Sequence, residues 1–210
     1  MGVRIKICGL STPETVEAAI AAGATHIGLN LYEPSPRFVP LGTAAELCEL
    51  ARGRIKVVML LVNADPEFTA RAIATIKPDA VQFHGSETPE WCGLVRDRSG
   101  LEVWKALGMK DAGTLERSAA YTGKVDRLLF DAPAKAMPGG TGETFSWDLL
   151  KGYRHTIDWA MAGGLTPENV ADAIRQTGAP LVDTSSGVET APGIKDVDLI
   201  HAFCKAAQLI

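Results

Sequence analysis

The feature that most constrains the fold is a regular alternation of short apolar runs, rich in β-branched residues, with amphipathic helical patterns. Patterns such as PETVEAAIAAG and TAAELCELARG separate successive runs, and each run has the length of a buried strand. Strand, helix and strand at this spacing form right-handed βαβ units and a parallel sheet. The runs occupy residues 3–8, 26–31, 56–62, 80–84, 102–107, 127–131, 156–162 and 181–185. Eight such units predict an α/β protein with a closed (β/α)8 TIM barrel, and a doubly wound open sheet is the alternative.

No linker, charge block or low-complexity stretch divides the 210 residues. We therefore expect residues 1–210 to form a single catalytic barrel domain. The formal net charge is −4 and no basic run is present, which argues against nucleic acid as a partner. Local basic residues remain available for a small anionic substrate.

The cysteines and the apolar runs indicate the compartment. Four cysteines are widely spaced without a CxxC pair, which is typical of reduced thiols rather than a disulfide frame or a metal site. Arg4 and Lys6 interrupt any N-terminal signal core, and the longest apolar run, residues 57–62, is too short to span a membrane. We expect a cytoplasmic protein with no membrane partner.

In a barrel of this kind, chemistry takes place at the carboxyl ends of the strands. Alternation in the first strand places Lys6 and Cys8 on the inner face, with Ile5 and Ile7 toward the helices. A buried lysine needs a carboxylate, and Asp183 on the neighbouring eighth strand is the candidate partner. Cys8 is either a small buried filler or a reactive thiol whose pKa is lowered by Lys6 and the following helix.

Two more strand ends and the loop after the second strand carry polar side chains. Asp131 ends the LLFDA run, where it either caps a loop or aims a carboxyl group into the barrel mouth as an acid. Arg37 lies in YEPSPRFV, whose prolines stiffen the loop, and it is either a carboxylate ligand or a solvated surface residue. His84 ends VQFHG, and contact with substrate and a structural role are both open.

Glycine-rich stretches follow the last three strands: residues 138–147, 162–170 and 184–189. Glycines let backbone N–H groups converge on an anion, and the last two loops of this fold commonly bind phosphate. These stretches predict a small phosphorylated substrate, with ordinary turns as the alternative. The GGTG at residues 139–142 has the composition of a lid.

Two similar helix starts support the repeated units. Thr12-Pro13-Glu14 and Thr166-Pro167-Glu168 each combine an N-cap, a proline at the first helical position and an acid in the first turn. We expect a helix to begin at each of them.

Taken in order, seven segments resemble the phosphoribosylanthranilate isomerase family across the whole chain. They are KICGL, GLNLYEPSPRFV, VQFHG, VWKAL, LLFDA with GGTGETFSW, MAGGLTPENV, and VDTSSGVE with PGIKD. The resemblance implies a (β/α)8 barrel in tryptophan biosynthesis. It implies conversion of N-(5-phosphoribosyl)anthranilate to 1-(2-carboxyphenylamino)-1-deoxyribulose 5-phosphate, an Amadori rearrangement that needs no cofactor or metal.

The resemblance also assigns roles. The base of the KICG motif falls on Cys8, the acid that ends the sixth strand on Asp131, and the arginine that grips the substrate carboxylate on Arg37. We place His84 and Asp183 at the substrate site as well. Leu31 and Ile194 depart from the usual family residues. Phosphate is expected against the backbone near Gly163, Gly164, Ser186 and Gly187.

Rival functions fit less well. A metal-dependent sugar-phosphate epimerase needs several histidine and carboxylate ligands at strand ends, and His84 is the only histidine there. An isomerase that also serves histidine biosynthesis would use two aspartates, and Cys8 stands at the position of the base. A non-catalytic phosphate-binding barrel would lack the acid or the base. A monomer and a homodimer both stay open.

Overall fold

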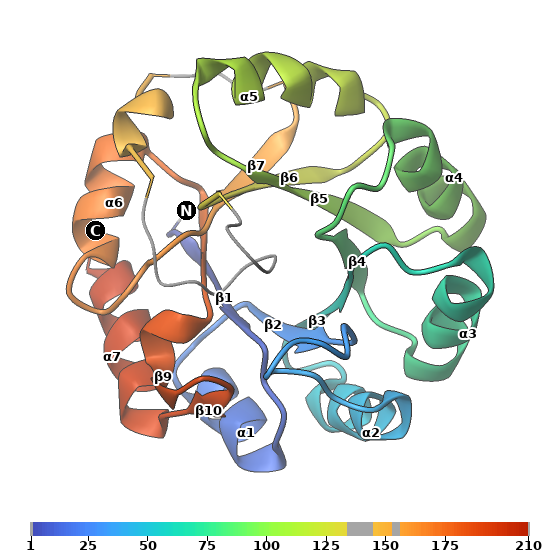
Figure 1. The fold of residues 1–210 in the computed structure, drawn as a ribbon. Coiled ribbons are helices and arrows are strands. Elements are labelled where there is room, and N and C mark those ends of the chain that lie inside the picture. The colour runs from blue at the N-terminus through green and yellow to red at the C-terminus, as the bar shows by residue number, and fades with distance from the viewer. Residues whose placement is uncertain (1, 134–144, 153–155, 210) are drawn as a thin grey trace.

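The computed structural model describes residues 2–133, 145–152 and 156–209. Eight parallel strands close into a barrel in chain order, each bonded to the next and β8 to β1 (Figure 1). This closure excludes the open sheet, and every strand ends within two residues of its predicted bounds. The strands are β1 Arg4–Cys8, β2 His26–Asn30, β3 Lys56–Leu61, β4 Ala80–Phe83, β5 Glu102–Gly108, β6 Arg127–Asp131, β7 Asp158–Met161 and β8 Leu181–Thr184.

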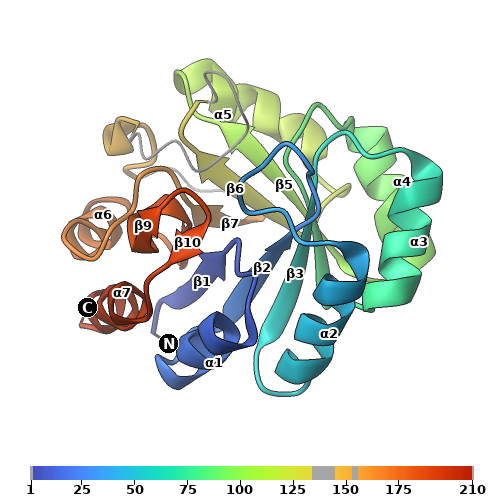
Figure 2. The same ribbon diagram turned by 60° about the horizontal axis from the view of Figure 1, so that its bottom comes forward.

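Helices surround the barrel as an outer ring (Figures 1 and 2). They are α1 Pro13–Ala21, α2 Leu41–Ala51, α3 Pro66–Ile76, α4 Pro89–Ser99, α5 Ala112–Ser118, α6 Val170–Thr177 and α7 Val197–Gln208. Short 3₁₀ helices are η1 Ala119–Tyr121, η2 Trp147–Leu149 and η3 Ser186–Val188. In the described part of the chain, η2 is the helical element between β6 and β7. None of the described helices is long and apolar enough to cross a membrane.

A small antiparallel hairpin follows η3. Its strands are β9 Glu189–Ala191 and β10 Ile194–Lys195, and it lies beside α7 in both views (Figures 1 and 2). This hairpin follows β8 and η3 in the chain, so it belongs to the end of the barrel where the site was expected.

The strand alternation divides the core in two, as predicted. Ile5 and Ile7 belong to the larger cluster, which lies between the sheet and the helices. A smaller cluster fills the barrel interior and includes Trp104 and Leu129, both fully buried. Inward-facing polar residues lie on both sides of this apolar layer: His26 and Arg127 contact the Trp104 ring toward the amino end, and Cys8 and Asp131 lie at the carboxyl end.

One predicted helix start is confirmed and the other is wrong. Thr12 caps α1 by accepting a hydrogen bond from the Thr15 N–H, with Pro13 at the first position. After β7, however, α6 begins only at Val170. The Asn169 side chain accepts from the Thr166 N–H at 2.8 Å and holds residues 166–169 in a turn. The predicted lid at residues 139–142 lies outside the described residues.

Candidate active site

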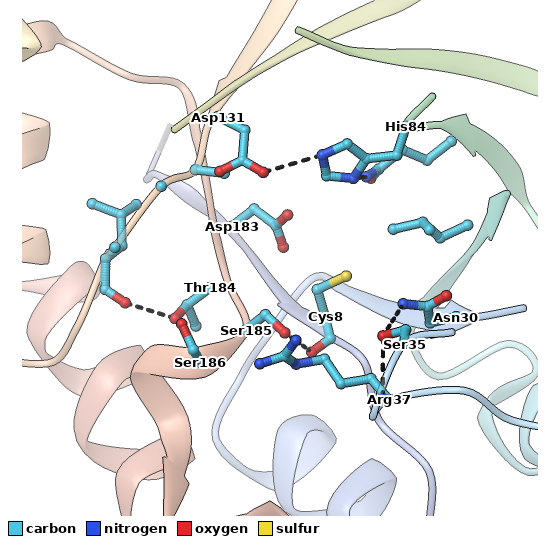
Figure 3. A pocket seen from close by; sticks show the side chains of 16 residues that line it. Cys8, Asn30, Ser35, Arg37, His84, Asp131, Asp183, Thr184, Ser185 and Ser186 are labelled. Carbon is cyan, nitrogen blue, oxygen red and sulfur yellow. Dashed lines mark hydrogen bonds and ion pairs between the residues drawn. The ribbon is translucent and has the colours of Figure 1, made fainter. Parts of the chain in front are cut away.

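A cavity opens among the carboxyl ends of the strands, and Figure 3 shows the side chains that line it. Of the predicted site residues, the cavity brings together Cys8, Arg37, His84, Asp131, Gly163, Gly164, Asp183 and Ser186. Gly187 does not line it and lies one residue behind Ser186. The structure therefore brings most of the predicted residues together around one cavity.

The Cys8 thiol occupies a space made by a glycine on the adjacent strand. Cys8 on β1 pairs with Gly28 on β2, and a Cβ added to Gly28 would lie 2.7 Å from Cys8 Sγ. Burial raises the pKa of this thiol, although the ammonium groups of Lys6 and Lys195 oppose the shift. The expectation that cations and the helix would lower the thiol pKa is therefore wrong, because desolvation is the larger effect.

Lys6 and Asp183 form the predicted buried ion pair. Lys6 Nζ donates to both Asp183 carboxylate oxygens at 3.0 Å, and the Lys6 side chain is 0% exposed. Burial opposes the charge on Lys6, but attraction to Asp183 and Cys8 raises its pKa above the ordinary value. Asp183 lines the cavity while it neutralises Lys6, so it fills the structural role and also faces the site.

The Asp131 carboxyl group is held from two sides. Its Oδ1 accepts the Ala132 N–H at 2.7 Å, and its Oδ2 lies 3.1 Å from His84 Nε2. The other ring nitrogen of His84 lies 3.3 Å from Gln82 Nε2. His84 therefore supports the candidate acid Asp131, which is a structural role, and it also lines the cavity, where contact with substrate stays open. In Figure 3 this pair lies across the cavity from Cys8, with Asp183 between them.

Arg37 is buried at the cavity and paired, so the reading as a solvated surface residue is wrong. Its Nε and Nη2 donate to the two carboxylate oxygens of Glu189, both at 2.7 Å. The loop before it is organised by Ser35, whose Oγ accepts the Arg37 N–H at 3.2 Å and the Asn30 side-chain amide at 3.1 Å. The guanidinium group of Arg37 therefore has a fixed direction, as predicted. The Glu189 carboxylate fixes it, in addition to the prolines of the loop.

The loops after β7 and β8 approach each other closely. Thr184 Oγ1 donates to the Leu165 carbonyl at 2.7 Å. A Cβ on Gly187 would lie only 1.9 Å from that same carbonyl oxygen, so the close approach requires glycine. Gly163 has a φ of +87°, and a Cβ there would meet the Ala132 N at 2.6 Å. These glycines let two backbone segments converge on one end of the cavity, as expected for an anion site.

Sequence reasoning missed several residues at the site. Asn30, Ser35 and Gln82 line the cavity, while Glu189 and Lys195 stand behind Arg37 and Cys8. Gln82 was detectable, because it lies two residues before His84 on the same inward face. Among the described residues, no group of three histidine, cysteine or acidic side chains is placed to hold a metal ion.

This arrangement defines a class of protein: a (β/α)8-barrel enzyme with acid–base groups and converging backbone loops at the carboxyl end of its sheet. Residues 5–206 match the family described as N-(5'-phosphoribosyl)anthranilate (PRA) isomerase. The chain belongs to this family. The prediction of an isomerase of tryptophan biosynthesis that converts an aldose to a ketose is thereby confirmed.

Relatives and solved structures agree over almost the full length. The N-(5'-phosphoribosyl)anthranilate isomerase of Erythrobacter litoralis is 65% identical over 204 residues, covering 97% of this chain and 98% of the relative. The crystal structure of the Thermotoga maritima enzyme has a TM-score of 0.90 at 33% identity, covering 99% and 100% of the two chains. A further phosphoribosylanthranilate isomerase structure, with a TM-score of 0.87 and 32% identity, is a complex with reduced 1-(o-carboxyphenylamino)-1-deoxyribulose 5-phosphate; it covers 99% and 100%.

Proposed function

We propose that the barrel acts as one catalytic domain in which Asp131 is the general acid and Cys8 the general base of phosphoribosylanthranilate isomerisation. Protonated Asp131 donates its proton to the ribose ring oxygen, and the C1′–O bond breaks to give a protonated Schiff base. The cationic imine acidifies the C2′–H, and the Cys8 thiolate removes that proton. The resulting enolamine then tautomerises to the amino-ketone.

The observation that carries this proposal is the placement of the thiol and the carboxyl group on opposite sides of one cavity (Figure 3). The two proton transfers occur at different atoms of the sugar, so an acid and a base on opposite sides suit a substrate bound between them. Asp131 is held by Ala132 and His84, which keeps its carboxyl group aimed into the cavity.

Two further groups orient the substrate. The backbone near Gly163, Gly164, Ser186 and Gly187 binds the phosphate, because these loops converge at one end of the cavity. Arg37, whose guanidinium group lies beside Ser185 in Figure 3, binds the carboxylate of the aryl ring. The ligand in the related complex carries both a phosphate and a carboxyphenyl group, which supports this division of the site.

Ionisation of Cys8 is linked to the reaction itself. The neutral thiol is favoured in the free enzyme, since burial outweighs the nearby ammonium groups. Formation of the cationic imine beside the thiol adds a positive charge in a site of low dielectric, which favours loss of the thiol proton to solvent water and leaves the thiolate. The base therefore becomes competent when the ring has opened, and the two proton transfers occur in order.

The test is the loss of substrate fluorescence when freshly made phosphoribosylanthranilate meets purified enzyme. Cys8→Ser and Asp131→Asn should each lower kcat by roughly 10²–10⁴-fold, the range for loss of an acid or a base. Cys204→Ser, at a buried cysteine in α7, and Asp172→Asn, on the exposed face of α6, are matched controls and should retain activity. Full activity in a folded Cys8→Ser or Asp131→Asn variant would refute the assignment of that residue.

A further inference from the structure

We propose that Glu189 and Lys195, on the β9–β10 hairpin, are positioning residues for recognition of the substrate carboxylate. Glu189 orients the guanidinium group of Arg37 but also neutralises its charge. Lys195 adds a second positive charge, so that this part of the site stays positive overall. The inference rests on the proposed function, since it concerns how Arg37 meets the aryl carboxylate.

The contact between Glu189 and Arg37 is buried and bidentate. Both oxygens of Glu189 accept from Arg37 at 2.7 Å, and the two side chains are 4% and 9% exposed. A bidentate pair restricts the plane of a guanidinium group more than a single hydrogen bond does. Glu189 therefore fixes how Arg37 faces the cavity that it lines.

The backbone around Arg37 confirms that its place is restricted. A Cβ on Gly9, which has a φ of +77°, would lie 2.7 Å from Arg37 Cδ. A Cβ on Gly193, in the turn of the hairpin, would lie 2.3 Å from the Pro36 carbonyl oxygen. The arginine stem thus lies against the residue that follows Cys8, and the hairpin packs against the arginine loop.

Lys195 connects this pair to the strand end that carries the base. Its Nζ donates to Glu189 Oε1 at 2.6 Å and to the Ser185 carbonyl at 2.9 Å, and its side chain is 1% exposed. Ser185 Oγ in turn donates to the Cys8 carbonyl at 3.1 Å. The buried ammonium group of Lys195 therefore contacts both Glu189, which accepts the hydrogen bonds of Arg37, and Ser185, which is hydrogen-bonded to Cys8.

The charges explain why a lysine is needed. Arg37 and Glu189 alone form a neutral pair, which offers a second carboxylate little attraction. With Lys195 present, the three groups carry one net positive charge, which matches one substrate carboxylate. Burial lowers the pKa of Lys195, and Glu189 is the main group that opposes this shift, so the lysine and glutamate depend on each other.

The experiment compares two ligands that differ only in the aryl carboxylate. They are reduced 1-(o-carboxyphenylamino)-1-deoxyribulose 5-phosphate and the same compound without its carboxyl group, and Kd is measured by calorimetry. In Lys195→Met the preference for the carboxylate ligand should fall by about tenfold or more, as for loss of a buried charge partner. Affinity for the second ligand should be unchanged, and Lys195→Arg should restore most of the preference. Lys205→Met, at an exposed lysine of α7, is the control.

Glu189→Gln separates orientation from charge. It removes a negative charge, so a purely electrostatic role predicts a stronger preference for the carboxylate ligand, whereas loss of the bidentate acceptor predicts a weaker one. We expect the weaker preference. A stronger preference, or an equal loss of affinity for both ligands in Lys195→Met, would overturn the inference. Failure of the wild-type enzyme to turn over phosphoribosylanthranilate would instead refute the proposed function, while both ligands still report on Arg37.

Discussion

A methyl group at position 28 offers a selective test of the thiol geometry. Gly28 lies opposite Cys8 in the register of β1 and β2, and a Cβ there would be 2.7 Å from Cys8 Sγ and 3.1 Å from Cys8 Cα. Nonbonded heavy atoms pack best at about 3.5–4.0 Å. Gly28→Ala therefore requires the sulfur to move by roughly 1 Å from its present place, or the two strands to separate.

Separation of the strands would appear as a loss of stability, and displacement of the sulfur as a loss of catalytic rate. Overpacking of this kind costs about 1–3 kcal/mol of unfolding free energy. A displacement of about 1 Å at a reacting group lowers the rate by roughly 10²-fold. We expect Gly28→Ala to reduce kcat by about that factor, while the Kd of the reduced product analogue changes little because Arg37 and the phosphate loops are not displaced.

The assay is steady-state fluorescence together with urea denaturation monitored by circular dichroism. Gly42→Ala is the matched control, because Gly42 lies exposed in α2 with no atom within 4 Å of an added Cβ. That change should leave kcat unaltered and stabilise the fold by up to about 1 kcal/mol. Wild-type kcat in Gly28→Ala would show that Cys8 Sγ does not need its present position, and the proposed role as base would fail with it.

Three other perturbations address buried charge. Lys6→Met should lower the unfolding free energy by about 3–5 kcal/mol in urea, because Asp183 is left buried without its ammonium partner; adding Asp183→Asn should recover part of the loss, and a loss below about 1 kcal/mol would contradict the pairing. Because burial raises the pKa of Cys8 above that of an ordinary thiol, kcat/KM should still be rising in mildly alkaline solution as the thiolate forms, and a plateau at neutral pH would contradict this. Burial lowers the pKa of His26 from 6.5 to about 3, so the folded state does not take up the proton that the unfolded state binds. Stability is therefore present above pH 6.5 and should be lost by about 1.4 kcal/mol per pH unit as pH falls toward 3, a slope that His26→Gln should reduce.

The sequence alone was sufficient to predict the barrel and the buried ion pair between Lys6 and Asp183. A period of two along each strand, with eight strands in chain order, decides which side chains face inward. Ring closure makes β8 a neighbour of β1, and the register then sets Lys6 directly opposite Asp183. No distance had to be known for that pairing, because a buried lysine on an inner face needs a carboxylate from an adjacent strand.

Other features depended on packing that no local pattern encodes. Arg37 and Glu189 are 152 residues apart, and their contact requires the hairpin to fold back onto the arginine loop. The start of α6 depends on the Asn169 side chain bonding backward, which competes with a start at Pro167. The pKa of Cys8 is a balance of burial against two cations, and only the structure shows how completely the strands enclose the thiol.

The charges around the thiol bear on the proposed role of Cys8 as a base, because they decide what it costs to ionise a buried cysteine. Asp183 alone would oppose a thiolate, and its charge would also act on Asp131 across the cavity. Lys6 neutralises that carboxylate from inside the barrel and contributes its own attraction to Cys8. Lys195 adds a second ammonium group from the hairpin side. A thiolate at Cys8 would lie beside the ammonium groups of Lys6 and Lys195, with Asp183 already neutralised by Lys6. Burial keeps the thiol neutral in the free enzyme, and the two ammonium groups limit the cost of ionising it in the proposed reaction.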